Sequence, residues 1–352
     1  MAKNELPKNV LITRFSALGD IAIAIPVVYD VCRTWPNVNF YFLTRPWQAT
    51  LFQNPPENLT VLPTDIRGQY GGMLGMWKLV RHLRKQYPID AMADLHSVIR
   101  TWQLELFMRL NGVRVQAIEK SRKERKLLTS GKLRKQLTPT IQRYRDVFSN
   151  LGLTSSGEHF HNIFDGTTPP QSHIVPQKPE GQRWIAISPF SSHVGKTYPL
   201  ELLIKVIEQV VAWPNTHVFL MGGGKAERTA LAPISALYDN ITSVAALEHN
   251  FTDELVLLNN CDVMVSMDSA NMHLAALVNL PVVSIWGGTH RYAGFMGFNC
   301  REDLVVERTD LDCRPCSIYG EKKCRYGDYR CLHGIDPQMI VDKIATVLKH
   351  KP

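Results

Sequence analysis

The sequence predicts an α/β protein with two domains, each built around an open, mainly parallel sheet. Its 352 residues correspond to about two domains at the usual ~150 residues each. Short apolar runs followed by turn residues and then by helical patterns recur along the chain, which is typical of βαβ units. Residues 166–181 are rich in proline and glycine, and they predict a linker between two sets of such runs.

The predicted strands fall into two groups, one before and one after that linker. They are residues 10–13, 39–43 and 91–94 in the first group, and 184–188, 217–221, 262–266 and 281–285 in the second. We therefore expect an N-terminal domain over residues 1–165 and a C-terminal domain over 182–335. A last helix is expected over 336–352, with Asp336 as its cap and proline at its first position.

Composition places the chain among ordinary globular proteins. Hydrophobic residues make up 45% and charged residues 20%, which excludes disordered and collagen-like proteins. The start of the sequence lacks the apolar region of a signal peptide, and no apolar run approaches the ~20 residues that span a bilayer. We expect a cytoplasmic protein that can touch a membrane. Its seven cysteines then favour thiols or a metal site over a disulfide framework.

Positive charge is concentrated in one segment. The chain carries a net charge of +8, and residues 120–135 alone hold eight basic residues and one acidic residue. Such a cluster fits an anionic partner, namely a phosphorylated lipid, a membrane surface or a nucleic acid. The structural alternative is a solvated basic loop.

The first strand leads into residues 14–20, RFSALGD, which precede an apolar helical face. Asp20 is therefore expected near a helix N-terminus, where the dipole favours its ionised form, and Gly19 permits close approach of another group. A carboxylate in that position could accept a proton from an attacking hydroxyl as a general base. The structural alternative is a plain helix cap.

Residues 266–273, SMDSANMH, join an apolar strand to a helix in the second half of the chain. Free backbone N–H groups at such a helix start suit a diphosphate. Asp268 and Ser269 could instead only cap the helix. His273 could reach a ligand or simply fill space against a neighbouring loop.

Two further strand-to-helix junctions carry candidate ligand contacts. Residues 188–196 end in Lys196, which could neutralise phosphate charge, although a single surface lysine is normally solvated. Residues 222–224 are three glycines that allow close approach of a ligand, or serve only as a turn. They lack the spacing of a dinucleotide fingerprint and the ending of a P-loop, which excludes nicotinamide-dependent and P-loop ATPase functions.

Four cysteines near the C-terminus follow a C-x2-C-x7-C-x6-C pattern: Cys313, Cys316, Cys324 and Cys331. Four thiolates could hold a structural zinc, and the alternatives are free thiols or a local disulfide. Cys32, Cys261 and Cys300 lie in apolar or strand-flanking contexts and are expected in the core.

The loop at residues 18–20, the loop of Lys196, and above all residues 266–277 followed by 281–289, PVVSIWGGT, resemble glycosyltransferase family 9, the lipopolysaccharide heptosyltransferase family. The resemblance extends over nearly the whole chain. It implies a GT-B fold, in which two Rossmann-like domains face each other across a cleft. It also implies that the N-terminal domain holds the acceptor and the C-terminal domain the nucleotide-sugar donor, typically ADP-heptose.

By the same resemblance, Asp20 would be the catalytic base and Lys196 the phosphate-binding lysine. The expected donor site comprises Ser188, Lys196, Gly222, Gly223, Asp268, Ser269, Ala270, Asn271, Met272 and His273. The expected acceptor site comprises Gly19, Asp94, His96, Arg122, Arg125, Arg143 and Arg145.

The resemblance thus predicts an inverting, metal-independent glycosyltransferase that moves a sugar, heptose from ADP-heptose, onto a lipopolysaccharide core or related glycolipid. Lys196 and the helix start would stabilise the leaving diphosphate without a metal or a cofactor. The expected partners are a nucleotide sugar, a phosphorylated glycolipid and the cytosolic face of the inner membrane, with no nucleic acid. The alternative is a non-catalytic protein that binds an anion or nucleic acid and has a structural cysteine cluster.

Overall fold

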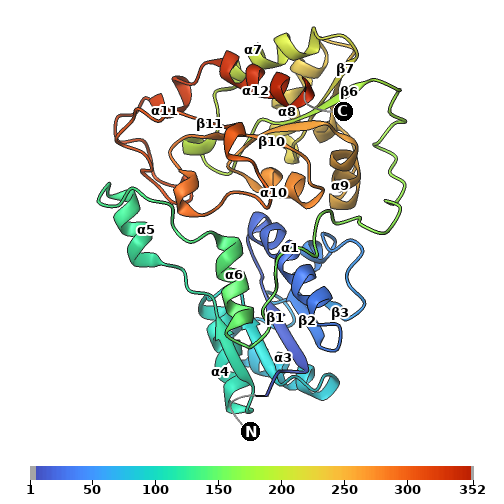
Figure 1. Ribbon diagram of the computed structural model, residues 1–352, viewed down its shortest axis with the longest axis vertical. Coiled ribbons are helices and arrows are strands. Elements are labelled where there is room, and N and C mark those ends of the chain that lie inside the picture. The colour runs from blue at the N-terminus through green and yellow to red at the C-terminus, as the bar shows by residue number, and fades with distance from the viewer. Residues whose placement is uncertain (1–4, 350–352) are drawn as a thin grey trace. The chain divides into compact units, whose positions relative to one another are not determined.

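The computed structural model describes residues 5–349, which form two compact units (Figure 1). The first unit consists of Met1–Lys120 and Thr140–Thr167, and the second of Ser121–Pro139 and Thr168–Pro352. Each unit has its own parallel sheet with helices on both faces. The predicted class, two Rossmann-like α/β domains, is confirmed.

The sheet of the first unit has the strand order β3-β2-β1-β4-β5, with all neighbours parallel. Its strands are β1 (Asn9–Thr13), β2 (Asn39–Thr44), β3 (Leu59–Pro63), β4 (Ala91–Asp94) and β5 (Arg114–Ala117). Strand order reverses between β1 and β4, where Val10 pairs with Ala91. Loops that leave two such neighbouring strands in opposite directions open a crevice at the carboxyl edge of the sheet.

Helices cover both faces of this sheet. α1 (Leu18–Thr34) contacts α6 (Thr140–Ser149), and α3 (Gly72–Gln86) contacts α4 (Ile99–Leu110). Alternate strand residues point to opposite faces, so Leu11 and Met92 pack with Leu79 of α3 and Leu104 of α4 in one hydrophobic cluster. The short helix α2 (Pro46–Ala49) follows β2.

The second unit contains a six-stranded parallel sheet in the order β11-β10-β9-β6-β7-β8. Its strands are β6 (Arg183–Ser188), β7 (Thr216–Leu220), β8 (Ile241–Ser243), β9 (Val263–Met267), β10 (Val282–Trp286) and β11 (Val305–Glu307). Here the order reverses between β6 and β9, and Ser188 lies beside Ser266 in the register. The ends of β6 and β9 are therefore the position at which a ligand of the second sheet is expected.

The longer helices of this unit are α7 (Leu200–Val211), α8 (Gly224–Ser235), α9 (Phe251–Asn260), α10 (Ala270–Leu277) and α12 (Pro337–Lys349), with a single turn, α11 (Arg330–His333), before the last. α12 packs against α7, and α10 against α9. The expected cap of the last helix is present, because the N–H of Gln338 donates to Asp336 Oδ1 at 2.9 Å. The end of the predicted range, residues 350–352, lies outside the described residues.

Residues 121–139 belong to the second unit, although the sequence-based range put them in the N-terminal domain. They include α5 (Arg122–Thr129). Leu128 and Leu137 form a small hydrophobic cluster with Ala293, and Arg134 pairs with Asp312 at 2.8 Å. The basic composition of the segment gave no sequence signal that these leucines would be buried. Their burial determines that the segment packs on the second unit.

Residues 166–181 have neither helix nor strand, as expected of a linker. Their latter part is nevertheless attached to the second unit, where Lys178 Nζ lies 2.8 Å from Asp262 Oδ2. The strands that the sequence did not predict, β3, β5, β8 and β11, are the edge strands of the two sheets. Half-exposed edge strands lack a continuous apolar run, so they give a weak sequence signal. Among the described residues, no helix combines the length and the apolar character needed to cross a bilayer.

Candidate functional site

Several of the predicted donor residues lie together at the ends of β6 and β9. Ser188 ends β6, Lys196 lies in the short turn Val194–Lys196 beyond it, and Asp268 follows β9. Asn271 Nδ2 donates to Ser188 Oγ at 2.6 Å, which joins the ends of the two strands. Lys196 Nζ lies 3.6 Å from Asp268 Oδ2, and both side chains are largely buried. Residues that are far apart in the sequence thus form one polar group.

Helix α10 begins at the same strand ends. Its first residues are Ala270, Asn271 and Met272, and its cap residue Ser269 makes no capping hydrogen bond through its side chain. Ser269 Oγ lies instead 3.2 Å from Ser266 Oγ. Because the first N–H groups of a helix have no partner within the helix, this start can receive an anion. Ser269 is thus the N-cap residue by position, but its side chain does not cap the helix, and His273 is buried within the helix.

The Lys196 turn rests on a later loop that sequence reasoning missed. Gly288 N–H donates to Gly195 O at 2.7 Å, so the turn is bound to the loop after β10. A Cβ atom at Gly320, which has φ +87°, would lie 2.5 Å from Lys196 Cγ. Only glycine leaves room there for the lysine stem. The glycine itself was the sequence signal of this contact.

Gly222 and Gly223 follow β7, the strand next to β6. The N–H of Gly223 donates to Glu227 Oε2 at 2.7 Å, and a Cβ atom at Gly222 would lie 3.0 Å from the same oxygen. These glycines therefore lie at the same edge of the sheet as Ser188. The N–H group of Gly223 is already bound to Glu227, so it is not available to a ligand in this conformation.

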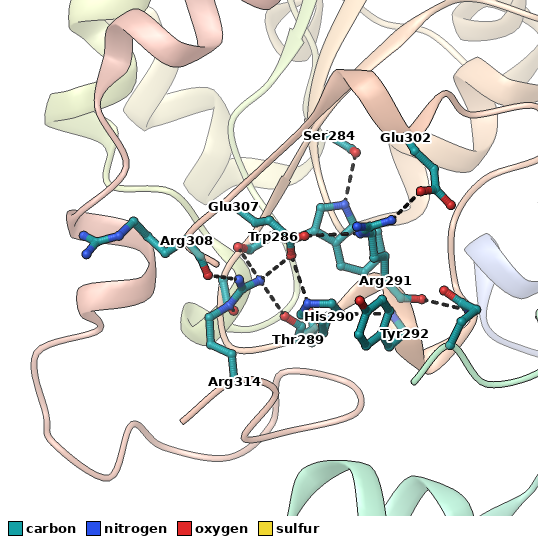
Figure 2. A network of polar contacts seen from close by, with 12 residues as sticks. Ser284, Trp286, Thr289, His290, Arg291, Tyr292, Glu302, Glu307, Arg308 and Arg314 are labelled. Atoms are coloured by element: carbon teal, nitrogen blue, oxygen red, sulfur yellow. Dashed lines mark hydrogen bonds and ion pairs between the residues drawn. The ribbon is translucent and has the colours of Figure 1, made fainter. Parts of the chain in front are cut away.

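A polar network fixes the loops after β10 and β11 (Figure 2). The guanidinium of Arg314 is 2% exposed and donates to the backbone oxygens of Trp286 and Thr289 and to Glu307 Oε2, at 3.0 to 3.1 Å. Glu307 also pairs with Arg291 at 3.2 Å. These groups border a cavity of ≈ 220 Å³. The loop after β10 contains Gly288, which binds the Lys196 turn. By fixing this loop, the network also helps to hold the Lys196 turn in place.

In the first unit, Asp20 lies in the first turn of α1, directly beyond the end of β1. Its Oδ2 pairs with the buried guanidinium of Arg14 and accepts a hydrogen bond from Ala17 N–H at 3.3 Å. Tyr144 of α6 donates to the backbone oxygen of Asp20 at 3.4 Å. Asp20 is thus both a capping side chain and half of an ion pair. Gly19 precedes it within the helix, and Arg14 is a contact that sequence reasoning missed.

Asp94 and His96 follow β4, the neighbour of β1 at the strand reversal. Asp94 is fully buried and accepts hydrogen bonds from Thr13 Oγ1 and from the N–H groups of His96 and Ser97, at 2.8 to 3.0 Å. A carboxylate with these partners holds its own loop together and is poorly placed to bind an acceptor directly.

His96 is the better candidate for a ligand contact in this loop. Its Nε2 lies 3.2 Å from Ser16 Oγ, and its Nδ1 is buried with no hydrogen-bond partner among the described residues. Burial and then the nearby charge of Arg14 lower the pKa of His96 to about 4. The ring is therefore neutral near pH 7 and can exchange hydrogen bonds with a hydroxyl group, but it supplies no positive charge for a phosphate.

The arginines expected at the acceptor site lie in different places. Arg143 of α6 is buried next to Tyr144, in the helix that contacts α1. Arg145 lies against Gly157, whose N–H donates to Asp30 Oδ2 at 2.9 Å. Asp30 is ten residues beyond Asp20 on α1, or about 15 Å along the helix. Arg145 is thus directed away from the strand ends.

Arg122 and Arg125 are carried by α5 in the second unit, not by the N-terminal domain. Arg122 is exposed. The guanidinium of Arg125 lies 4.9 Å from the ring centre of Phe295 and donates to Tyr319 Oη at 2.7 Å. The cation–π contact with Phe295 and the hydrogen bond to Tyr319 hold α5 against the rest of the second unit. The expected acceptor residues are therefore divided between the two units, with Arg122 and Arg125 in the second.

The four clustered cysteines line one small cavity of ≈ 20 Å³, together with Gly195, Gly288 and four basic residues. All seven cysteines have free thiols, and burial raises the pKa of Cys331 to about 11. In residues 5–349, no three His, Cys, Asp or Glu side chains are arranged to hold a metal ion. The cluster is a group of free thiols rather than a disulfide, and it lies beside the Lys196 turn.

Comparisons with known proteins agree with this geometry. The family model of Glycosyltransferase family 9 (heptosyltransferase) matches residues 76–322, well over half of the chain. The chain is 22% identical over 294 residues to the lipopolysaccharide core heptosyltransferase OpsX of Haemophilus influenzae, covering 80% of each sequence.

Solved structures show the same fold. A glycosyl transferase family 9 protein from Veillonella parvula is similar with a TM-score of 0.70 and 15% identity, over 98% of each chain. The ADP-heptose LPS heptosyltransferase II of E. coli is similar with a TM-score of 0.65 and 17% identity, over 97% of this chain and 98% of that one. The predicted GT-B class is thereby confirmed.

Proposed function

Because the chain belongs to glycosyltransferase family 9, whose members are nucleotide-sugar-dependent glycosyltransferases, we propose that it transfers heptose from ADP-heptose to a lipopolysaccharide core or related glycolipid. The name of the similar E. coli enzyme supports this donor, and that of OpsX supports a lipopolysaccharide acceptor. Membership of an enzyme family also sets aside the alternative of a non-catalytic nucleic-acid-binding protein.

One observation carries the donor assignment. Lys196, Asp268 and the start of α10 lie together at the strand reversal of the second sheet. A leaving nucleoside diphosphate gains negative charge as its bond to the sugar breaks, and an ammonium group and free helix N–H groups stabilise that charge. Asp268 and Ser188 then serve as acceptors for the hydroxyl groups of the donor. This arrangement supports metal-independent transfer, since the protein itself supplies the positive charge.

Asp20 is the proposed general base. Both of its protein contacts use Oδ2, which leaves Oδ1 as the atom that accepts the proton of the acceptor hydroxyl. Attack by that hydroxyl on the anomeric carbon forms the new C–O bond, while the bond to the diphosphate breaks and the electron pair leaves with ADP. A single displacement of this kind inverts the anomeric configuration. His96 is proposed to orient the acceptor through a neutral hydrogen bond.

The test is a transfer reaction with purified protein, ADP-heptose and a lipopolysaccharide core acceptor, in buffer with EDTA. We expect acceptor-dependent release of ADP, unchanged by EDTA, and a product whose anomeric centre, seen by NMR, is opposite to that of the donor. Retained configuration would contradict the single displacement. A panel of other nucleotide sugars controls for the donor, because a true donor raises the melting temperature of the folded protein more than its analogues do.

We also propose that the protein works at the cytosolic face of the inner membrane, where a lipid-linked acceptor and a soluble nucleotide sugar are both accessible. The basic segment at residues 120–135 is suited to the phosphates of such an acceptor. Replacing Lys123 and Lys126 by glutamate should raise the KM for a phosphorylated acceptor and leave the KM for ADP-heptose unchanged. An equal rise in both would argue against this role.

A further inference from the structure

Helices α3 and α4 expose apolar side chains on the surface that faces away from their sheet. Leu74 is 76% exposed and Ile99 is 70% exposed. We define the lipid face as Met73, Leu74 and Trp77 of α3 and Ile99, Trp102 and Leu106 of α4, all of which are exposed. Soluble proteins rarely expose so many large apolar groups on two adjacent helices without a partner for them.

The spacing of these residues shows that they form a surface rather than a scatter. Ile99, Trp102 and Leu106 recur at three and four positions along α4, which places them on one side of the helix. Leu104 and Met108 occupy the opposite side and are buried in the core against the sheet. On α3, Trp77 lies four positions after Met73. Each helix thus has two apolar sides. One side is buried against the sheet of its own unit, and the other is exposed.

The two helices lie side by side with matching ends. They contact each other directly, and Arg84 near the end of α3 donates to the backbone oxygen of Asn111, the residue that ends α4, at 2.7 Å. Both helices follow parallel strands, so both begin at the carboxyl edge of the sheet. The apolar residues of α3 are in its first turns, and Ile99 and Trp102 are in the first turns of α4. Most of the lipid face therefore lies toward that edge, and Leu110, which is 73% exposed, continues the apolar stripe to the end of α4.

The lipid face adjoins the loop of His96. Trp102 Nε1 donates to Ser97 Oγ at 3.2 Å, and Ser97 is bound through its N–H to Asp94. The indole is thus bound by its N–H group to the loop after β4, while Trp102 as a whole remains 45% exposed. Tryptophan with one polar and one apolar end is the residue type that is enriched at the level of lipid headgroups.

Charge distinguishes a bilayer from a second copy of the chain. α3 carries four basic residues, Lys78, Arg81, Arg84 and Lys85, and no acidic residue. The guanidinium of Arg81 lies 5.7 Å from the ring centre of Trp77, so charge and apolar surface are adjacent. Two such faces would repel each other, whereas an anionic lipid surface attracts basic groups and accepts the apolar side chains between its headgroups.

We propose that the lipid face of α3 and α4 docks the protein onto a bilayer that contains anionic lipids, beside the loop that carries His96. This inference rests on the proposed function for its purpose, since a lipid-linked acceptor must be reached at the membrane. The contact is peripheral, with the exposed apolar side chains entering the headgroup region. The position of the lipid face determines which edge of the sheet is directed toward the bilayer. The net charge of the chain alone would not select an edge.

Vesicle sedimentation of the full chain tests the proposal. We expect binding to vesicles of phosphatidylglycerol and phosphatidylethanolamine at low salt, and weak binding to phosphatidylcholine alone. Leu74→Ser/Trp77→Ser and Ile99→Ser/Leu106→Ser should each weaken binding by about tenfold or more. The matched control is Leu237→Ser/Met339→Ser, which removes exposed apolar groups of the second unit and should bind like the unmodified protein. Equal binding by all three variants would overturn the proposal.

Two further measurements separate this proposal from its alternatives. If the face joins two copies, sedimentation velocity will show a concentration-dependent dimer that Leu74→Ser/Trp77→Ser abolishes, and the bilayer proposal falls. With an acceptor whose acyl chains have been removed, the Leu74→Ser/Trp77→Ser variant should keep full activity, but it should lose activity on the acceptor embedded in vesicles. Vesicle binding without any transfer would overturn the proposed function and leave the docking surface standing.

Discussion

Lys196 Nζ lies 3.6 Å from Asp268 Oδ2, and this ion pair joins the loop after β6 to the loop after β9. The two residues are neighbours because β6 and β9 are adjacent parallel strands, so that the loops after them begin side by side at the same edge of the sheet. The lysine charge is thereby held at the start of α10. A diphosphate that binds there would meet a cation already fixed in place.

Lys196→Met should weaken the binding of ADP by about 10- to 100-fold. The reason is the loss of a charge-assisted contact, which contributes roughly 1.5 to 3 kcal/mol. Isothermal titration calorimetry measures the change. Lys205→Met, on the exposed side of α7, is the matched control and should bind ADP like the unmodified protein. Unchanged affinity in Lys196→Met would remove the lysine from the phosphate site.

Asp20→Asn should slow transfer by about 10²- to 10⁴-fold, since the amide cannot accept the proton of the acceptor hydroxyl. The affinity for ADP should not change. Single-turnover kinetics measures the rate, and thermal unfolding shows whether losing the ion pair with Arg14 has cost stability. Asp146→Asn, an exposed carboxylate of α6, serves as the control and should retain full activity.

Ser188 and Asn271 should show energetic coupling. The hydrogen bond of 2.6 Å between their side chains predicts a coupling of about 0.5 to 1.5 kcal/mol in a double-mutant cycle of Ser188→Ala and Asn271→Ala. Urea unfolding of the four proteins gives the free energies. Strictly additive effects would show that the contact contributes nothing to stability.

Glu105→Gln should stabilise the protein at alkaline pH. Burial and the neighbouring Asp94 raise the pKa of Glu105 to about 7 from its ordinary value of 4.5. The folded protein therefore holds a proton that the unfolded chain releases, and the free energy of unfolding falls as pH rises from about 4.5 to 7. Glutamine does not ionise, so Glu105→Gln should not show this fall in the free energy of unfolding. The melting temperature of Glu105→Gln relative to the unmodified protein should increase between pH 5 and pH 8.

The control for that experiment is Glu158→Gln, an exposed carboxylate of the first unit. Its melting temperature should follow that of the unmodified protein at every pH. If Glu105→Gln followed it as well, Glu105 would be ionised in the folded protein throughout that range.

Arg314→Met should destabilise the second unit by about 3 to 5 kcal/mol. The buried guanidinium neutralises Glu307 and binds backbone oxygens of the loop after β10, and its removal leaves a buried charge with less compensation (Figure 2). Chemical unfolding measures the effect. Arg301→Met removes an exposed ion pair with Asp303 and should cost far less stability than Arg314→Met. Similar losses in the two variants would contradict a structural role for the Arg314 network.

Several site residues were predictable because strand ends are visible in the sequence. An apolar run that stops at Ser188, or just before Asp268, marks the edge of a parallel sheet, and ligands of open α/β sheets bind at that edge. The pairing of Asp20 with Arg14 was not predictable, since both follow the same strand and nothing local shows that they face each other. The role of Gly320 could not be found either, because it depends on a lysine from a distant turn.

The sequence by itself determined the alternation of strands and helices, the division at the proline-rich segment and the resemblance to the family, because these depend on local apolar periodicity and on short motifs. Only the tertiary structure decided that residues 121–139 join the second unit and that α3 and α4 share an exposed apolar face. It also decided that the Asp94 carboxylate is occupied by hydrogen bonds from its own loop. Each of these depends on which side chains meet across long separations in the chain, and burial and partner choice are properties of the packed structure rather than of any segment.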